Sequence, residues 1–90
     1  MNPKVKHVTP TENHTLIVMF ESGERREFDV KPYLDSGIFT ELQDKGKFQS
    51  VKVVAGSVEW LHGQDLSYDT LYVAGVPVMD EDSHYAVVNQ

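Results

Sequence analysis

The sequence predicts an α+β domain, with a small, mainly antiparallel sheet and two short helical segments in the order β-β-β-α-β-β-α. Two observations predict this class. Short runs of alternating or β-branched apolar residues lie between turn-forming loops, and two groups of such runs are each followed by a stretch with helical spacing. The 90 residues suffice for one domain with a modest core. We therefore expect a single domain over residues 1–80 and a loosely held tail over residues 81–90.

Three strands are predicted at the start of the chain, over residues 5–9, 15–20 and 25–30. The second run, TLIVMF, is the richest in β-branched and aromatic residues, so we expect it to be the central strand and to be buried on both faces. Gly23 lies between the second and third runs, where a hairpin turn favours glycine. Together the three runs predict a meander.

The stretch from Phe28 to Phe39 marks the change from strand to helix. Phe28 and Val30 have the same parity and should point to one face. Pro32 favours the first position of a helical turn over residues 32–35, and Gly37 can close that turn with a positive φ. A second helical segment is expected over residues 38–44, closed by residues 45–47, with an apolar face made of Ile38, Phe39 and Leu42.

A second hairpin is predicted over residues 51–54 and 57–61, which alternate around Ala55 and Gly56. Trp60 is the largest residue expected in the core. The predicted inward positions of this hairpin are Val51, Val53, Val58 and Trp60.

The last helix is predicted over residues 67–72, with Ser67 as its N-cap and Asp69 in its first turn. Gly75 should end it, and residues 76–78 should be extended. Beyond them the charged run at residues 80–82 and the few apolar residues that follow predict the loosely held tail.

The charge balance limits the classes of partner. The formal charge is −6 and the pI is near 5.0, with 8 Lys and Arg against 14 Asp and Glu. Binding to phosphates needs basic side chains, so direct binding to nucleic acid or to an anionic membrane is not expected. A basic protein surface is a better match.

Cysteine usage and hydropathy suggest a compartment. The chain has no cysteine, which excludes disulfides and thiolate metal sites. The longest apolar run is residues 16–20, and the first residues carry no signal-peptide pattern, so we expect neither a membrane span nor export. A cytoplasmic location is the expectation.

The residues with reactive side chains form no motif for catalysis. His7, His14, His62 and His84 lack the spacing of metal ligands, so no metal or cofactor is expected. No phosphate-binding glycine loop and no G-x-S-x-G motif occurs. His62 with Asp65 and Asp69 could form an acid-base group, but Asp65 and Ser67 are better explained as acceptors for N–H groups at the helix start. The chain is therefore not expected to be an enzyme.

Three segments carry a resemblance to a known family. They are FDVKPYLDSGIFTELQD at residues 28–44, F-x-x-V-x-V at residues 48–53 and VEWLHGQDLSYDTLY at residues 58–72. In combination they resemble the DUF2442 family of small bacterial domains without an assigned activity, over residues 5–78. Members commonly have Pro-Asn-Gly after the tryptophan, where this chain has Leu61, His62 and Gly63.

The resemblance implies a small α+β fold that is sometimes fused to a helix-turn-helix. It also implies the antitoxin-like half of a two-protein module. This chain has no room for a helix-turn-helix, so a role on DNA would have to come from a partner.

Two hypotheses for the function follow. In the first, the domain binds a protein, such as a toxin-like or regulatory partner encoded nearby or a second copy of this chain, because a small core gains from association. In the second, it is a small-ligand binder or minor enzyme that uses the loop over residues 62–69. The surface predicted for the protein partner consists of Tyr33, Asp35, Asp65, Tyr68 and Tyr72, since tyrosines anchor interfaces and carboxylates complement a basic partner.

Overall fold

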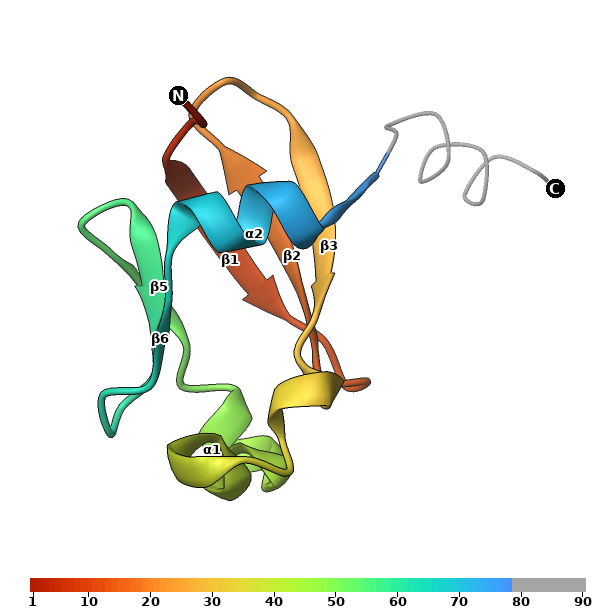
Figure 1. Ribbon diagram of the computed structural model, residues 1–90, viewed down its shortest axis with the longest axis vertical. Helices are drawn as coiled ribbons and strands as arrows, with labels where there is room; N and C mark the ends of the chain where they lie inside the picture. Colours follow the sequence, from red (N-terminus) through yellow and green to blue (C-terminus); the bar gives the residue numbers. More distant parts are fainter. Residues whose placement is uncertain (79–90) are drawn as a thin grey trace, which may run out of the picture.

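The computed structural model describes residues 1–78 and confirms the α+β class (Figure 1). The predicted tail over residues 81–90 lies outside the described residues. The strands form two antiparallel sheets. The first has the order β1-β2-β3-β7, with β1 (Val5–Pro10), β2 (Thr15–Phe20), β3 (Arg25–Asp29) and β7 (Val76–Pro77). The second has the order β4-β5-β6, with β4 (Lys52–Val54), β5 (Ser57–Glu59) and β6 (Asp65–Leu66).

The first sheet begins with the predicted meander. Strand β2 is central, between β1 and β3, and its residues Leu16, Val18 and Phe20 are fully buried. The expected burial of β2 on both faces is wrong, because Ile17 and Met19 on the opposite face are only half-buried. Helix α2 (Tyr68–Ala74) crosses one face of this sheet in Figure 1, and only the residues on that face are shielded completely.

The segment after β3 forms the predicted helical turn. Phe28 and Val30 are both buried, as their shared parity predicted. Pro32 lies in the 3-10 helix η1 (Lys31–Tyr33), and Gly37 has a φ of +49°, which confirms the left-handed position.

The helix expected over residues 38–44 is instead a 3-10 helix, η2 (Gly37–Gln43). In a 3-10 helix residues i and i+3 share a face, so Phe39 and Leu42 turn inward together while Ile38 lies about a third of a turn away. The predicted apolar face is therefore wrong for Ile38, whose exposed fraction is 65%.

Residues 45–47 do not close that helix. Asp44 is extended and its carboxylate accepts a hydrogen bond from the Lys47 backbone N–H at 2.9 Å, so it caps a new one-turn helix, α1 (Lys45–Phe48). An aspartate that bonds to a nearby N–H interrupts a helix and starts the next one. The sequence-based boundary was therefore wrong, and Phe48 is brought into the core at the end of α1.

The second hairpin is confirmed. Ala55 and Gly56 have φ values of +51° and +82°, as in the two-residue turns that join antiparallel strands. The Gly56 carbonyl accepts a hydrogen bond from the Val5 N–H at 2.8 Å, which ties this turn to the first sheet. Among the predicted inward residues, Val51, Val58 and Trp60 are buried and Val53 is half-buried.

Helix α2 confirms the predicted cap, because the Ser67 hydroxyl accepts a hydrogen bond from the Thr70 N–H at 3.2 Å. It continues to Ala74, two residues beyond the prediction. Gly75 then allows the chain to pass directly into β7: a Cβ there would lie 2.5 Å from the Leu71 carbonyl oxygen and 3.0 Å from the Arg26 Cβ. None of the helices within residues 1–78 is long and apolar enough to cross a membrane.

Candidate functional site

The five residues predicted for a partner surface lie on three elements. Tyr33 ends η1 and Asp35 follows it, Asp65 is in β6, and Tyr68 and Tyr72 are in α2. The two aspartates are exposed and the three tyrosines are half-buried. The ring contacts separate the tyrosines, since Tyr33 packs near Phe28 and Phe39 whereas Tyr72 packs against Phe20.

Tyr72 belongs to an intramolecular network with Glu24 and Arg26. Its hydroxyl donates to Glu24 Oε1 at 2.9 Å, and the Arg26 guanidinium lies 3.9 Å from the centre of its ring. Arg26 also pairs with Glu24 at 2.7 Å. The Tyr72 hydrogen bond, helped by Arg26 and opposed by burial, lowers the pKa of Glu24. These contacts join α2 to β3, so Tyr72 has a structural role.

A groove lies between η1 and the end of α2, and we call it the η1–α2 groove. Its volume is about 490 Å³. Ala74 and Asp29 also border a neighbouring depression that reaches Val76 in β7. The residues that line the groove itself are Phe28, Asp29, Pro32, Tyr33 and Ala74.

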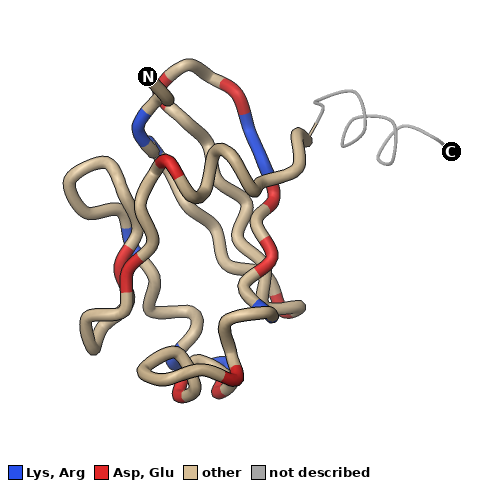
Figure 2. Tube along the Cα trace, viewed as in Figure 1, with Lys and Arg blue, Asp and Glu red and all other residues tan. Residues whose placement is uncertain are grey.

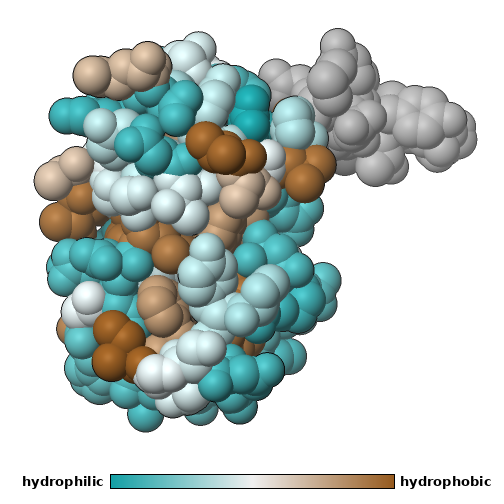
Figure 3. All heavy atoms as spheres, viewed as in Figure 1, coloured by the Kyte–Doolittle hydropathy of each residue, from teal (hydrophilic) through white to brown (hydrophobic). Residues whose placement is uncertain are grey.

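Two aliphatic side chains, one in the last turn of α2 and one in β7, face solvent. The exposed fractions of Val73 and Val76 are 73% and 66%. Figure 3 shows hydrophobic side chains exposed over α2 and toward β7. Val76 borders the depression that adjoins the groove, and exposed aliphatic side chains beside a groove are typical of a binding surface.

Carboxylates border the groove on β3, and Figure 2 shows acidic residues along the half of β3 nearest η1. Burial acts to raise the pKa of Asp29, but the Lys31 backbone N–H at 2.9 Å and the Lys31 ammonium at 3.0 Å outweigh it, and the pKa is lowered. Glu27 accepts a hydrogen bond from the Thr15 hydroxyl at 2.7 Å. Asp29 is therefore ionised at neutral pH and gives the groove a negative border.

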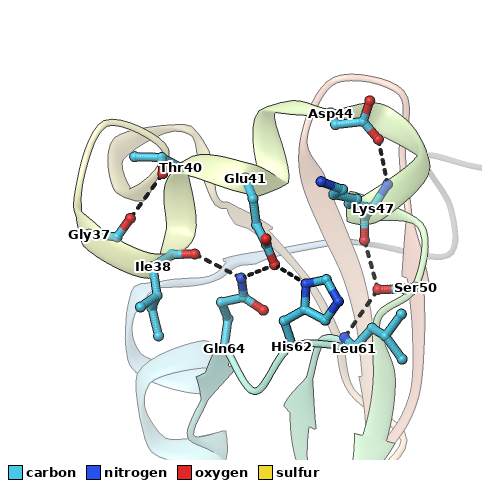
Figure 4. Close-up of polar contacts among 10 residues, drawn as sticks. All are labelled: Gly37, Ile38, Thr40, Glu41, Asp44, Lys47, Ser50, Leu61, His62 and Gln64. Atoms are coloured by element: carbon cyan, nitrogen blue, oxygen red, sulfur yellow. Dashed lines mark hydrogen bonds and ion pairs between the residues drawn. The ribbon is translucent and has the colours of Figure 1, made fainter.

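The turn over residues 60–64 is the second candidate region. It is closed by hydrogen bonds from the Trp60 N–H to the Gln64 carbonyl and from the Gly63 N–H to the Trp60 carbonyl. Figure 4 shows that this turn meets η2, where two side chains of the turn contact Glu41. His62 Nδ1 lies 2.8 Å from Glu41 Oε2, and Gln64 Nε2 donates to the same oxygen at 2.6 Å.

The structure does not assemble His62 with Asp65 and Asp69. Asp65 lies opposite Glu59 in the antiparallel pairing of β5 with β6. Its neighbour Leu66 belongs to the same strand and is buried. The prediction that Asp65 accepts hydrogen bonds from N–H groups at the start of α2 is wrong. The Ser57 hydroxyl accepts the hydrogen bond from the Tyr68 N–H instead. Asp69 accepts a hydrogen bond from the Asn2 side chain.

Sequence reasoning missed Glu41 and Gln64. They lie 23 positions apart, and neither belongs to a motif that relates them. The Gln64 hydrogen bond, followed by the His62 contact, lowers the pKa of Glu41 against the effect of burial. Glu41 is thus ionised at neutral pH and cannot act as a general acid there.

The other histidines of the described chain do not form a cluster. His14 Nε2 lies 3.1 Å from the Gln43 carbonyl oxygen and its ring packs against Phe48, while His7 is exposed on β1. His84 lies outside the described residues. Within residues 1–78 no group of three or more His, Asp or Glu side chains is placed to hold a metal ion.

Comparison with known proteins gives a family without an assigned activity. The model of the family described as "Protein of unknown function (DUF2442)" matches residues 5–77. No curated protein and no solved structure matches the chain. The family match covers most of the chain, including both sheets, the 60–64 turn and the η1–α2 groove. The chain therefore belongs to the DUF2442 family.

Proposed function

We propose that this domain functions by binding a protein in the η1–α2 groove. The observation that carries the proposal is the exposure of Val73 and Val76 beside an apolar groove, although the core is already closed by fully buried residues such as Leu71. Exposing aliphatic side chains to water is unfavourable, and contact with a partner would remove that cost. Of the predicted surface, Tyr33 lines this groove directly.

The chemistry of the border favours a basic partner segment with aliphatic side chains. Asp29 is ionised, Glu27 is exposed beside it, and the whole chain carries a formal charge of −6. Lysine or arginine on the partner would be attracted to this border and would orient the aliphatic contact. The partner that the family resemblance implies, a toxin-like protein encoded nearby, is the first to test.

The enzyme alternative has less support. His62 is held by Glu41, and Ser50, the hydroxyl nearest this turn, donates to the Lys47 carbonyl, so no nucleophile is paired with a base there. Asp65 and Asp69 make separate contacts. Binding of a small ligand at the same turn does not need a nucleophile and would depend on the side chains of Gln64 and Glu41.

The test is co-purification of the chain with the protein encoded beside it. Ala74→Arg places a charged, bulky side chain in the groove at an exposed helical position, and we expect it to weaken capture by at least about tenfold. Thr9→Arg is the matched control, because Thr9 is exposed on β1 at the opposite edge of the sheet. Equal capture of the partner by the two variants would exclude the groove as the binding site.

The remaining residues of the predicted surface have their own variants. Asp35→Lys and Asp65→Lys are at exposed positions and should leave the circular dichroism spectrum unchanged. Asp35 follows Tyr33 closely, so its reversal should weaken capture more than reversal of Asp65, which lies on β6. The opposite ranking would move the interface away from η1.

A further inference from the structure

A second cavity lies between the 60–64 turn and α1, and we call it the Gln64 cavity. Its volume is about 200 Å³. A water molecule occupies about 30 Å³ in the liquid, so the space admits a small organic ligand. The polar residues that line it come from η2, from α1 and the residues that flank it, and from the turn; they are Glu41, Asp44, Lys47, Ser50, His62 and Gln64.

Gln64 is the most unusual of these residues, because it is a polar side chain with an exposed fraction of only 1%. Its Nε2 donates to the Ile38 carbonyl oxygen at 2.7 Å and to Glu41 Oε2 at 2.6 Å. Both partners are acceptors, so the two hydrogen bonds fix which end of the amide carries the nitrogen.

The other end of the amide is unsatisfied. Gln64 Oε1 is buried and has no hydrogen-bond partner among residues 1–78. Figure 4 shows this oxygen turned away from Glu41 and Ile38, on the side of His62. A buried acceptor without a donor is rare in folded proteins. Within the described residues no group donates to this atom, so a further donor placed here would satisfy the amide.

Charged groups surround the same space. The hydrogen bonds that Glu41 accepts within residues 1–78 both end on Oε2, so its other carboxylate oxygen is open to a cation. Figure 4 shows the Lys47 ammonium turned toward Glu41, and the charge of Lys47 contributes to the lowered pKa of Glu41. The cavity thus combines the Gln64 oxygen and the carboxylates of Glu41 and Asp44 with one lysine, and Leu61 and Leu42 supply apolar wall.

We propose that the Gln64 cavity binds a small zwitterion of the α-amino-acid type, such as glycine, alanine or serine. The ligand ammonium donates to Gln64 Oε1 and to the open oxygen of Glu41, and the ligand carboxylate pairs with Lys47. A charge-assisted hydrogen bond to a buried acceptor is stronger than one to a solvated acceptor. The proposal is independent of the η1–α2 groove, which shares no lining residue with this cavity.

The test is a nuclear magnetic resonance titration of the isotope-labelled chain with glycine, alanine and serine in turn. We expect saturable shifts of the Gln64 side-chain amide and of the His62 and Gly63 backbone amides. Methylamine and acetate each carry half of the ligand, and each should bind more weakly than alanine. A cavity filled by water alone would show no saturable shift with any of the three amino acids up to high millimolar concentration, and that result would overturn the proposal.

The variants separate this site from general charge effects. Lys47→Met removes the positive group at the cavity and should weaken alanine binding by about tenfold or more. Lys45→Met is the matched control, since Lys45 is exposed on the same helix but does not line the cavity. Equal alanine binding by the two variants, or acetate binding as tight as alanine binding, would also refute a zwitterion site. Ala74→Arg should leave the titration unchanged.

Discussion

Two regions of this domain are stabilised in different ways. The first, formed by β1, β2, β3 and α2, buries apolar residues: Leu16, Val18, Phe20 and Leu71 each have an exposed fraction of 0%. The second, which we call the turn region, is formed by η2, α1 and residues 60–64. It buries Trp60 and Gln64, each 1% exposed, and both use side-chain nitrogens to reach backbone carbonyls.

The turn region shows a consistent pattern around its short helices. Short helices leave many of their carbonyls without an intrahelical partner. In and around η2 and α1 such carbonyls accept side-chain donors: Leu34 from Gln43, Ile38 from Gln64, Phe48 from Trp60 and Lys47 from Ser50. The sheet region thus depends on a pattern shared by many residues, whereas the turn region depends on single polar side chains.

The largest effect is expected at Trp60, whose ring packs near Phe39 and Phe48 and whose Nε1 donates to the Phe48 carbonyl oxygen at 2.9 Å. Trp60→Ala should lower the free energy of unfolding by about 3–5 kcal/mol, because a large buried aromatic is removed. Denaturant unfolding measures this. Trp60→Phe keeps most of the ring and should cost less. Fluorescence typical of exposed indole in the folded parent would contradict the buried position.

The next effect concerns Gln64. Gln64→Met keeps the size of the side chain but leaves the Ile38 carbonyl and Glu41 without their donor, and we expect a loss of about 1–3 kcal/mol in the free energy of unfolding. Thermal and denaturant unfolding of the variant check this value. A variant as stable as the parent would mean that the turn region does not depend on this side chain.

A smaller effect is expected from pH, and each region contains one glutamate that tests it. The pKa values of Glu24, which precedes β3 and bonds to Tyr72 of α2, and of Glu41 in the turn region both lie below the ordinary value of 4.5 in the folded chain. A lowered folded-state pKa stabilises the fold above 4.5, and that contribution is lost as the pH falls through the folded-state value. The melting temperature of the parent should therefore decrease as the pH is lowered below 4.5.

Matched variants assign this pH dependence to a region. Glu24→Gln and Glu41→Gln each remove one titrating carboxylate, so each should show a smaller acid-induced decrease in melting temperature than the parent. Differential scanning calorimetry across this pH range measures both. If the melting temperatures of both variants fell with pH in parallel with that of the parent, the contacts of Glu24 and Glu41 would not contribute to the pH dependence of stability.

The smallest effect is expected from removing residues 81–90, which lie outside the described structure. Their sequence has a charged start and few apolar residues, so the deletion should change the free energy of unfolding by less than about 0.5 kcal/mol. Denaturant unfolding of the full chain and of the shortened chain measures this difference. A loss of more than about 2 kcal/mol would assign the segment to the folded core.

The sheet region was largely predictable from the sequence. The β-branched run at residues 15–20, the turn at Gly23 and the polar outer face of residues 25–30 predicted the pairing of β2 with β3, and the capping chemistry of Ser67 predicted the start of α2. These signals are local, because strand parity and helix caps involve neighbours in sequence. The extent of burial was less predictable, since it depends on whether a second layer covers the other face of β2.

The turn region was predicted less well, for a physical reason. Helical spacing did not distinguish an α-helix from the 3-10 helix η2, so Ile38 was assigned to the wrong face. Asp44 caps a new helix where the pattern predicted the last residue of the preceding one. The contacts of Glu41 with His62 and Gln64 join positions 21 and 23 residues apart, and no local pattern encodes them.

Amide hydrogen exchange tests the difference between the two regions most directly, because it measures the free energy of opening at each residue. We expect the amides of β2, such as that of Val18, to exchange only through global unfolding. The amides of η2 and α1 exchange faster through local opening, and Gln64→Met accelerates them without affecting β2. Equal protection in the two regions, or an equal response of both to Gln64→Met, would contradict the account.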